Sequence, residues 1–532
     1  MHSLLPFILV LILLIVFLTI FANKLKVAYP ILLVLAGLAI SFVKGLPILK
    51  IDPDLIFFVF LPPLLYEAAW GVSFKEMKKW WRIIGSFAFL VVFFTAFLVA
   101  IISNHIIPGF TIALGFVLGG IVSPPDAVST GAITKFVKIP KTTTAILEGE
   151  SLLNDASSLI IFRFALVAVG TGQFIWQDAG LNFLWMLFGG VGIGLLVAQI
   201  FIWIHKHLPT EAASDIALSL ISPYFMYWIA EQIHCSGVLA VVAGGLFMSS
   251  QRLNYLAASS RIKGASVWES FVFLLNGMVF LLIGLDLPEI VAGIRAHGTP
   301  LGTAIGYGVL ITIVLIAARM ISAFAAMLAT IIFRPQVAHQ QQFSTRRWYT
   351  PLLMGWTGMR GVVSLAAALA IPLTLPNGEA FPHRNLILFI TFVVILLTLV
   401  IQGLTLPYLI KKTNPFKGYI NEEENHQSSK IKMKLGLKSH VYTFIKNNYE
   451  SQHPDDPAMQ RILKYWEDQS KVQDNSWMNG VSKKMLLEIF SQQRIYLTNL
   501  NKEEEYDEEL IRNQIYQIDL EEERIILVFD KQ

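Results

Sequence analysis

The sequence predicts an all-α, polytopic membrane protein that ends in a helical cytoplasmic tail. Of its 532 residues, 55% are hydrophobic and only 15% are charged, and the mean hydropathy is +0.60. Apolar runs separated by short polar loops follow one another as far as residue 410, where the composition abruptly becomes polar. A soluble domain cannot bury this much apolar surface, whereas a bilayer solvates it directly.

Most of the apolar runs are at least about 17 residues long, the length with which a helix can span the hydrocarbon core. The eighth and ninth runs are separated only by residues 234–236. We therefore expect about thirteen transmembrane helices, near residues 4–22, 27–43, 54–70, 83–106, 109–134, 142–169, 180–204, 212–232, 236–250, 266–290, 301–333, 351–374 and 385–410.

The charges of the loops predict the orientation. If the loops alternate between the two sides, sixteen Lys and Arg residues lie on one side and four on the other. Cytoplasmic loops carry the excess of positive charge, so we expect the N-terminus outside and the C-terminus in the cytoplasm. The sixteen are Lys24, Lys26, Lys75, Lys78, Lys79, Arg82, Lys135, Lys138, Lys141, Lys206, Arg252, Arg261, Lys263, Arg334, Arg346 and Arg347, and the four are Lys44, Lys50, Arg295 and Arg384.

The sequence argues against a cleaved signal peptide, a disulfide, a cysteine-based metal site and nucleic-acid binding. The first apolar run begins at Leu4 without a basic segment before it or a small-residue cleavage site after it, which indicates a retained helix rather than a signal peptide. Cys235 is the only cysteine, which excludes an intrachain disulfide and a cysteine-based metal site. A net charge of +4 is too small to indicate nucleic-acid binding.

Composition divides the chain into a membrane domain, residues 1–410, and a tail, residues 411–532. The first part holds 23 Lys and Arg against 16 Asp and Glu, and the second holds 18 against 21. Two interpretations of the mildly acidic tail stay open: an extension without activity, or a regulatory or dimer-stabilising module. Its expected helices lie near 436–449, 456–470, 481–498 and 503–527.

Among the ionisable residues inside the predicted spans, four acids and three arginines stand out. A charge at the centre of a bilayer costs roughly 2.5–3.5 kcal/mol, so each of them needs a partner or a function. They form a polar interior in which some pairing is expected, although the sequence does not say which acid Arg319 meets. The seven are Glu67, Asp126, Glu150, Asp155, Arg163, Arg319 and Arg360.

The densest polar cluster lies in the sixth span. On a helix, Ser151 and Asp155 share one stripe, and Glu150 and Asn154 share the neighbouring stripe. The carboxylate, amide and hydroxyl oxygens of this patch are hard ligands, which suit hard cations and not zinc or copper.

Two spans are predicted to be broken helices. The fifth contains Pro124-Pro125-Asp126, and two prolines interrupt the helical hydrogen bonds. The twelfth contains three glycines, Gly355, Gly358 and Gly361, around an arginine. If the seventh span is a linker, the breaks fall in the fifth helix of each six-helix half, a pattern typical of transporters built from inverted repeats.

Three motifs, in this order, resemble the monovalent cation:proton antiporter family, which includes bacterial sodium/proton antiporters and animal Na+/H+ exchangers. They are the Pro125-Asp126 break, 24 residues before Glu150, the segment Glu148–Asp155, and the run Gly358–Ser364. The resemblance covers residues 1–410. It implies a homodimer in a cell membrane, each subunit having a dimerisation domain and a core domain in which two discontinuous helices cross. It also implies electroneutral exchange without a cofactor.

The resemblance also implies site residues. The Asn154-Asp155 pair matches the signature of the transport site, and Ser151 and Glu67 match positions that help to bind the ion. Glu67 lies near the end of its span, so an interfacial acid is the alternative reading.

Two further positions of the family motif concern the breaks. Glu150 is implied to pair with Arg360, and we expect this pair to be structural. The usual Thr-Asp-Pro at the first break is replaced here by Pro125-Asp126-Ala127. A backbone carbonyl, Ser123, Ser129 or water must then replace the lost hydroxyl. Asp126 is either an ion ligand or a group that satisfies the ends of the broken helix.

These observations predict a secondary antiporter that exchanges Na+, or Li+, for H+ and serves pH and sodium homeostasis. Asp155 would hold either a proton or a cation. A K+/H+ antiporter on the same scaffold is the alternative, because Pro125 removes a familiar ligand. A cation channel would usually show a repeated filter or an acidic ring, which the sequence lacks. An intramembrane aspartyl protease would resemble Gly-x-Gly-Asp, and no such tetrapeptide occurs.

Overall fold

The computed structural model describes residues 4–25, 27–43, 53–126, 131, 141–172, 176–296, 299–333, 349–376, 378–413, 436–450, 457–471, 480–500 and 508–530. The chain divides into two compact units, Met1–Gly418 and Tyr419–Gln532.

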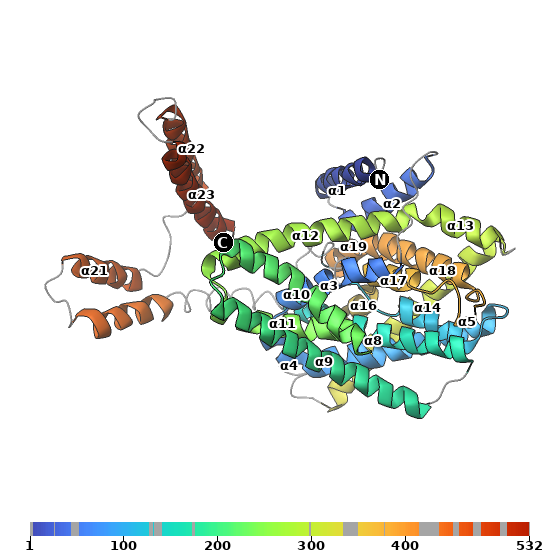
Figure 1. The fold of residues 1–532 in the computed structure, drawn as a ribbon. Helices are drawn as coiled ribbons and strands as arrows, with labels where there is room; N and C mark the ends of the chain where they lie inside the picture. Colours follow the sequence, from blue (N-terminus) through green and yellow to red (C-terminus); the bar gives the residue numbers. More distant parts are fainter. Residues whose placement is uncertain are drawn as a thin grey trace. The chain divides into compact units, whose positions relative to one another are not determined.

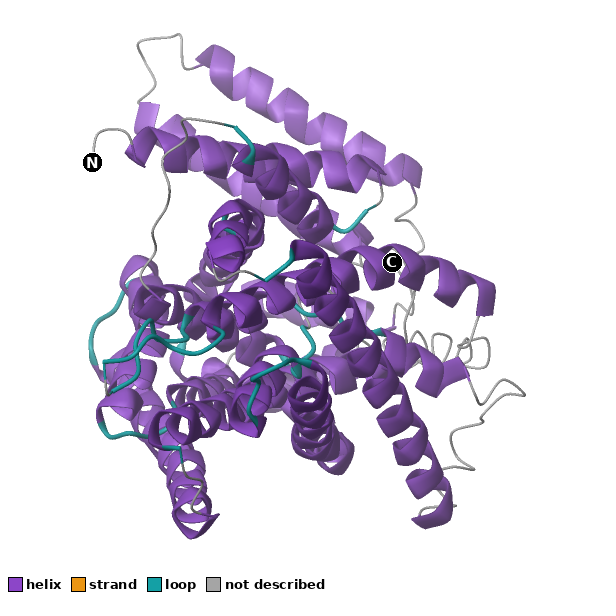
Figure 2. Cartoon of the chain, turned by 90° about the vertical axis from the view of Figure 1, so that its right-hand side faces the viewer, coloured by secondary structure: helices purple, strands orange, loops and turns teal. Residues whose placement is uncertain are grey.

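The described part of the first unit is built from helices, with one isolated bridge between Thr374 and Ala380 (Figures 1 and 2). A helix or a run of helical segments lies on each predicted apolar range. In chain order they are α1 (Leu4–Leu25), α2 (Tyr29–Ser41), α3 (Pro53–Gly71), α4 (Phe74–Gly85), η1 (Ser86–Val91), α5 (Val92–Ile106), α6 (Ile112–Val122), α8 (Lys141–Thr171), α9 (Trp176–His207), α10 (Ala212–Gln232), α11 (Gly237–Tyr255), α12 (Ala258–Leu285), α13 (Leu287–Ala296), α14 (Leu301–Phe333), α16 (Tyr349–Trp356), α17 (Val362–Leu369), α18 (Arg384–Leu397), η2 (Thr398–Gln402) and α19 (Gly403–Thr413).

Seven helical segments among the described residues are long and apolar enough to cross a membrane. Three shorter apolar helices accompany them, at Tyr29–Ser41, Phe57–Gly71 and Ile112–Val122. The expected helical membrane protein is therefore confirmed, while the count of thirteen spans stays a prediction. The seven segments are Pro6–Leu25, Lys75–Ile106, Thr143–Thr171, Phe183–His207, Ala258–Arg295, Leu301–Ala329 and Arg384–Thr413.

A helix ends at each of the two predicted breaks. Helix α6 ends at Val122, directly before the Ser123–Asp126 stretch, and residues 357–361 separate α16 from α17. Prolines explain the first break, because they remove backbone donors. Apart from Gly131, the rest of predicted span 109–134 beyond Asp126 lies outside the described residues.

Helix α6 is held between α5 and α8 by contacts that only glycine permits. A Cβ atom on Gly119 would lie 2.6 Å from the carbonyl oxygen of Ala96 on α5. On the opposite side, a Cβ atom on Gly120 would lie 2.9 Å from the backbone nitrogen of Phe162 on α8. Small residues at helix interfaces let backbones approach closely inside a membrane.

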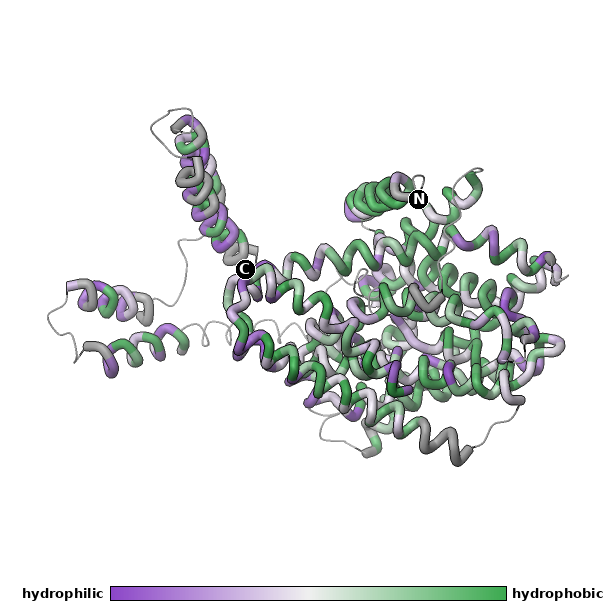
Figure 3. Tube along the Cα trace, viewed as in Figure 1, coloured by the Kyte–Doolittle hydropathy of each residue, from purple (hydrophilic) through white to green (hydrophobic). Residues whose placement is uncertain are grey.

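Hydrophobic residues predominate along the first unit (Figure 3), and many of the large ones are exposed in the isolated chain. Phe17, Phe188 and Leu196 are each more than 60% exposed in the isolated chain. Lipid tails, and not water, are the solvent that suits such a surface.

The described residues of the second unit are also helical and more polar (Figure 3). They comprise residues 436–445, η4 (Lys446–Glu450), α21 (Pro457–Lys471), α22 (Gly480–Leu500) and α23 (Glu508–Asp530). Helices α22 and α23 pack against each other, and Arg494 on α22 forms ion pairs with Asp519, at 2.6 Å, and with Glu522.

Candidate ion-binding site

One turn of α8 carries four polar residues that are buried almost completely. Glu150, Ser151, Asn154 and Asp155 are all at most 8% exposed. The spacing of four residues places Ser151 beside Asp155 and Glu150 beside Asn154, as the sequence predicts. In the interior of a membrane protein, such a group requires ion pairs, hydrogen bonds or a bound ion.

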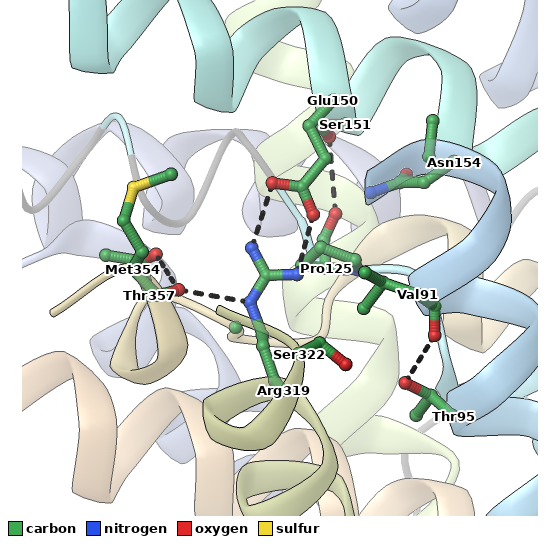
Figure 4. A network of polar contacts seen from close by, with 12 residues as sticks. Val91, Thr95, Pro125, Glu150, Ser151, Asn154, Arg319, Ser322, Met354 and Thr357 are labelled. Carbon is green, nitrogen blue, oxygen red and sulfur yellow. Dashed lines mark hydrogen bonds and ion pairs between the residues drawn. The ribbon is translucent and has the colours of Figure 1, made fainter. Parts of the chain in front are cut away.

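Glu150 forms its ion pair with Arg319 of α14. The two guanidinium nitrogens Nη1 and Nη2 donate to Oε1 and Oε2 of Glu150 at 2.6 and 3.1 Å (Figure 4). The Nε of Arg319 also donates to the carbonyl oxygen of Met354 on α16 at 3.3 Å. The expected pairing of Glu150 with Arg360 is therefore wrong. Helix α14 packs beside α16, and this places the Arg319 guanidinium against the Glu150 carboxylate.

Arg360 instead joins the two breaks. Its Nε donates to the carbonyl oxygen of Val122 at 2.5 Å, at the end of α6, and one of its Nη atoms donates to the carbonyl of Gly358. Its backbone N–H donates to the hydroxyl of Thr398 at 3.2 Å. The last carbonyls of a helix lack intrahelical partners, and a cation stabilises that end of the helix.

Asp126 completes the junction between the breaks. Its backbone N–H donates to the carbonyl oxygen of Met359 at 2.7 Å. A Cβ atom on Gly361 would lie 2.3 Å from Oδ2 of Asp126, so the carboxylate lies directly against a glycine of the second break. The two interruptions are therefore in contact, although they are more than 200 residues apart in the sequence.

The first break also touches α8. The hydroxyl of Ser151 donates to the carbonyl oxygen of Pro125 at 3.3 Å (Figure 4). The carbonyl of Pro125 thus lies beside the α8 cluster at the position where the family motif has a threonine. The hydroxyl of Ser123 is buried and has no hydrogen-bond partner among the described residues. Ser129, the other candidate, lies outside the described residues.

The side-chain amide of Asn154 is the most unusual group of the site. It is fully buried, and neither its nitrogen nor its oxygen has a hydrogen-bond partner among the described residues (Figure 4). Buried amides are normally satisfied, because desolvation without a hydrogen bond costs roughly 1–3 kcal/mol. An amide left in this state beside Asp155 is suited to hold a ligand.

Glu67 lines a different cavity. That cavity has a volume of about 410 Å³ and lies between α3, α10, α11 and α12, where Glu269 and Asp215 also border it. None of the α8 cluster is among its lining residues. A role for Glu67 as a direct ligand beside Asp155 stays a prediction.

Sequence reasoning missed two groups. Thr398, at the start of the π-helical segment η2, accepts the backbone N–H of Arg360. Asp215 is buried and joins His205, at 2.7 Å, to Ser260, at 2.6 Å. Asp215 lies near the end of a predicted span, where an acid usually faces water, so its sequence position gave no signal.

Comparisons with known proteins agree with this architecture. The model of the family described as "Sodium/hydrogen exchanger, transmembrane" matches residues 10–412. A sodium, potassium, lithium and rubidium/H+ antiporter of Bacillus subtilis is 33% identical over 389 residues, which are 71% of this chain and 57% of the relative. An uncharacterised Na+/H+ exchanger of Mycobacterium tuberculosis is 28% identical over 96% of this chain and 94% of its own.

The fold also matches a solved structure. The sodium proton antiporter NhaP1 of Methanocaldococcus jannaschii, solved at pH 8, aligns with a TM-score of 0.60 at 18% sequence identity. The alignment covers 77% of this chain and 98% of the archaeal chain. At this identity the match shows a shared fold.

Proposed function

The chain belongs to the sodium/hydrogen exchanger family, and we propose that it exchanges Na+ for H+ at a site centred on Asp155. Members of this family are antiporters of monovalent cations and protons, not enzymes, and they need no cofactor. The protein is accordingly a multi-pass membrane antiporter.

The observation that carries the proposal is the unsatisfied amide of Asn154 beside Asp155. A monovalent cation bound there would receive oxygens from the Asp155 carboxylate, the Asn154 amide and the Pro125 carbonyl. Alkali cations prefer such hard oxygen ligands. The Ser123 hydroxyl is the candidate replacement for the hydroxyl that Pro125 removes, and Asp126 contributes negative charge from the first break.

Exchange follows from competition for one carboxylate. A bare carboxylate in a low-dielectric interior carries a desolvation penalty of several kcal/mol, which a proton or a cation removes. The site therefore changes its exposure from one side of the membrane to the other only when Asp155 is protonated or has bound a cation. One titrating carboxylate gives one-for-one, electroneutral exchange by alternating access. Glu150, neutralised by Arg319, plays a structural part in this scheme.

We also propose how the protein is located, oriented and assembled in the membrane. The loop charges support an external N-terminus and a cytoplasmic C-terminus in a cell membrane. The family relationship supports a homodimer that serves pH and sodium homeostasis. We propose in addition that the tail, residues 411–532, is a regulatory module.

Asp155→Asn tests the proposal. In proteoliposomes with an imposed pH gradient, we expect added Na+ to drive protons out of the vesicles through the unchanged protein and so dissipate the gradient. Asp155→Asn should reduce this Na+-driven proton release to the level of empty vesicles. Glu148→Gln, at an exposed acid of the same helix, is the matched control and should retain exchange. Full activity of Asp155→Asn would remove Asp155 from the centre of the mechanism.

A K+/H+ exchanger is the second candidate. Pro125 alters the ligand set, and the Bacillus subtilis relative is named for four alkali cations. Proton release measured with Na+, Li+ and K+ in turn, over a range of pH, separates the two candidates. Na+ is expected to give half-maximal release at the lowest concentration.

A further inference from the structure

The strongest contact that the proposed exchange leaves unexplained is an ion pair between α8 and α10. The Nη2 atom of Arg163 lies 2.7 and 2.8 Å from the two carboxylate oxygens of Glu231. The side chains are 36% and 27% exposed, so the pair is partly solvated and not locked in the core. Arg163 lies eight residues after Asp155 on the same helix, about 12 Å along its axis.

The pair bridges two groups of helices that otherwise touch little. Helix α8 packs closely against α4 and α6, and α9, α10 and α11 pack closely against one another. Helix α8 also contacts α3, α9 and α11, but much less extensively than it contacts α4 and α6. The ion pair therefore links the helix that carries the α8 cluster to a separate layer formed by α9–α11.

A cavity lies at this junction. Its volume is about 730 Å³, and Arg163 and Glu231 both line it. Leu159 contributes from α8, Phe57 from α3 and Met186 from α9. Both helix groups thus face a common space that the ion pair crosses.

Glu231 is held in place from its own side. Its Oε1 accepts the backbone N–H of Gly237 at 3.1 Å, at the first residue of α11. A Cβ atom on Gly237 would lie 2.9 Å from the same oxygen, so the start of α11 fits closely around the carboxylate. The α9–α11 layer therefore holds the Glu231 carboxylate in position, and Arg163 on α8 supplies the opposite charge.

We propose that Arg163 and Glu231 form a latch that holds the α8 group against the α9–α11 layer at this end of the molecule. The inference rests on the proposed alternating access. When the Asp155 site opens toward this end, the cavity must widen, and the pair must separate. The latch then sets the population of the open and closed states without binding the transported ion, because a contact made in only one of two states shifts their equilibrium.

Cysteine labelling tests the latch without depending on transport. Cys235→Ala removes the only cysteine, and Leu159→Cys then places a probe on the α8 wall of the cavity. The rate of reaction with a charged maleimide is measured on the full chain in lipid nanodiscs, where both ends are accessible. Val117→Cys, fully buried on α6, replaces the probe in a matched control that detects general loosening.

The latch is opened by Glu231→Gln and, separately, by Arg163→Gln. Gln at position 231 keeps an oxygen that can accept the N–H of Gly237, so only the ion pair is lost. We expect labelling at position 159 to accelerate about two- to fivefold, in line with the modest energy of partly exposed ion pairs. Labelling at position 117 should not change. Glu211→Gln, an exposed acid before the opposite end of α10, should leave both rates unchanged.

The double variant with Arg163→Gln and Glu231→Gln should accelerate labelling at position 159 no more than either single variant does, because both changes remove the same ion pair. Unchanged labelling in both single variants would overturn the latch. So would equal acceleration at positions 159 and 117, because that pattern indicates unfolding. Loss of exchange in Asp155→Asn is a separate readout, so failure of the transport proposal is distinguishable from failure of the latch.

Discussion

The backbone N–H of Asp126 donates to the carbonyl oxygen of Met359 at 2.7 Å, so the two broken helices are bonded to each other at their interruptions. In the other direction, the Nε of Arg360, in the second break, donates a hydrogen bond of 2.5 Å to the carbonyl oxygen of Val122 at the end of α6. Each break thus satisfies backbone groups that the other leaves without an intrahelical partner. A change at one break should therefore alter the other.

Gly361→Ala tests this junction. The new methyl group would lie 2.3 Å from Oδ2 of Asp126, so the carboxylate or the backbone of the second break must shift. We expect the rate of Na+-driven proton release in proteoliposomes to fall at least about tenfold. Gly306→Ala is the control, because a Cβ atom at that position of α14 meets nothing within 4 Å. Equal activity of the two variants would show that the junction tolerates displacement.

Arg319→Gln should destabilise the fold more than it changes ion selectivity. It leaves Glu150 as a buried charge without its partner, a change that typically costs about 3–5 kcal/mol. The midpoint of thermal unfolding in detergent should fall clearly. Adding Glu150→Gln should recover most of the loss, because the unpaired charge is then gone. A double variant as unstable as the single one would argue against this pairing.

Asn154→Ala should separate ion binding from folding. The amide has no hydrogen-bond partner among the described residues, so its removal should change the free energy of unfolding by less than about 1 kcal/mol. The Na+ concentration for half-maximal exchange should rise at least about tenfold. A large loss of thermal stability with unchanged Na+ dependence would assign the amide a structural role.

Ser123→Ala and Pro125→Thr address the altered ligand set. If the buried Ser123 hydroxyl replaces the missing threonine, its removal should weaken Na+ binding by about 1–2 kcal/mol, or roughly five- to thirtyfold. Adding Pro125→Thr should restore part of that affinity, since it supplies a hydroxyl at the familiar position. Na+ titrations of proton release measure both. Unchanged affinity in Ser123→Ala would leave the Pro125 carbonyl or water as the substitute.

Truncation after Gly418 tests the tail. The chain divides into compact units at this point, so the membrane unit should retain Na+/H+ exchange without residues 419–532. If the tail is regulatory, the pH at which exchange is half-maximal should shift by more than 0.3 units, roughly a twofold change in proton concentration. An identical pH profile would favour an extension without regulatory activity.

Local sequence signals predicted the helices and their interruptions, because hydrophobic run length, prolines and glycines act through the backbone nearby. The polar cluster on α8 could be predicted for the same reason: helical spacing fixes which side chains are neighbours. The partner of Glu150 could not. Arg319 and Arg360 are equally good partners in the sequence, and only the packing of α14 beside α16 decides between them.

The ion pair of Arg163 shows the same limit. Its sequence position indicates a buried cation, but Glu231 lies at the end of another helix, 68 residues away. Contacts of this kind depend on how separate helices are placed, which no single-residue pattern encodes. The link between Ser151 and the carbonyl of Pro125 is also tertiary, since backbone acceptors leave no mark in a sequence.

The glycine contacts of α6 have a mechanical consequence. With Gly119 against the backbone of α5 and Gly120 against the backbone of α8, these three helices mesh main chain to main chain. Sliding one past another would drive carbonyls and Cα atoms into each other. If the ion site moves during exchange, we expect α5, α6 and α8 to move together as one rigid unit, and relative motion to occur at helix interfaces formed by side chains alone.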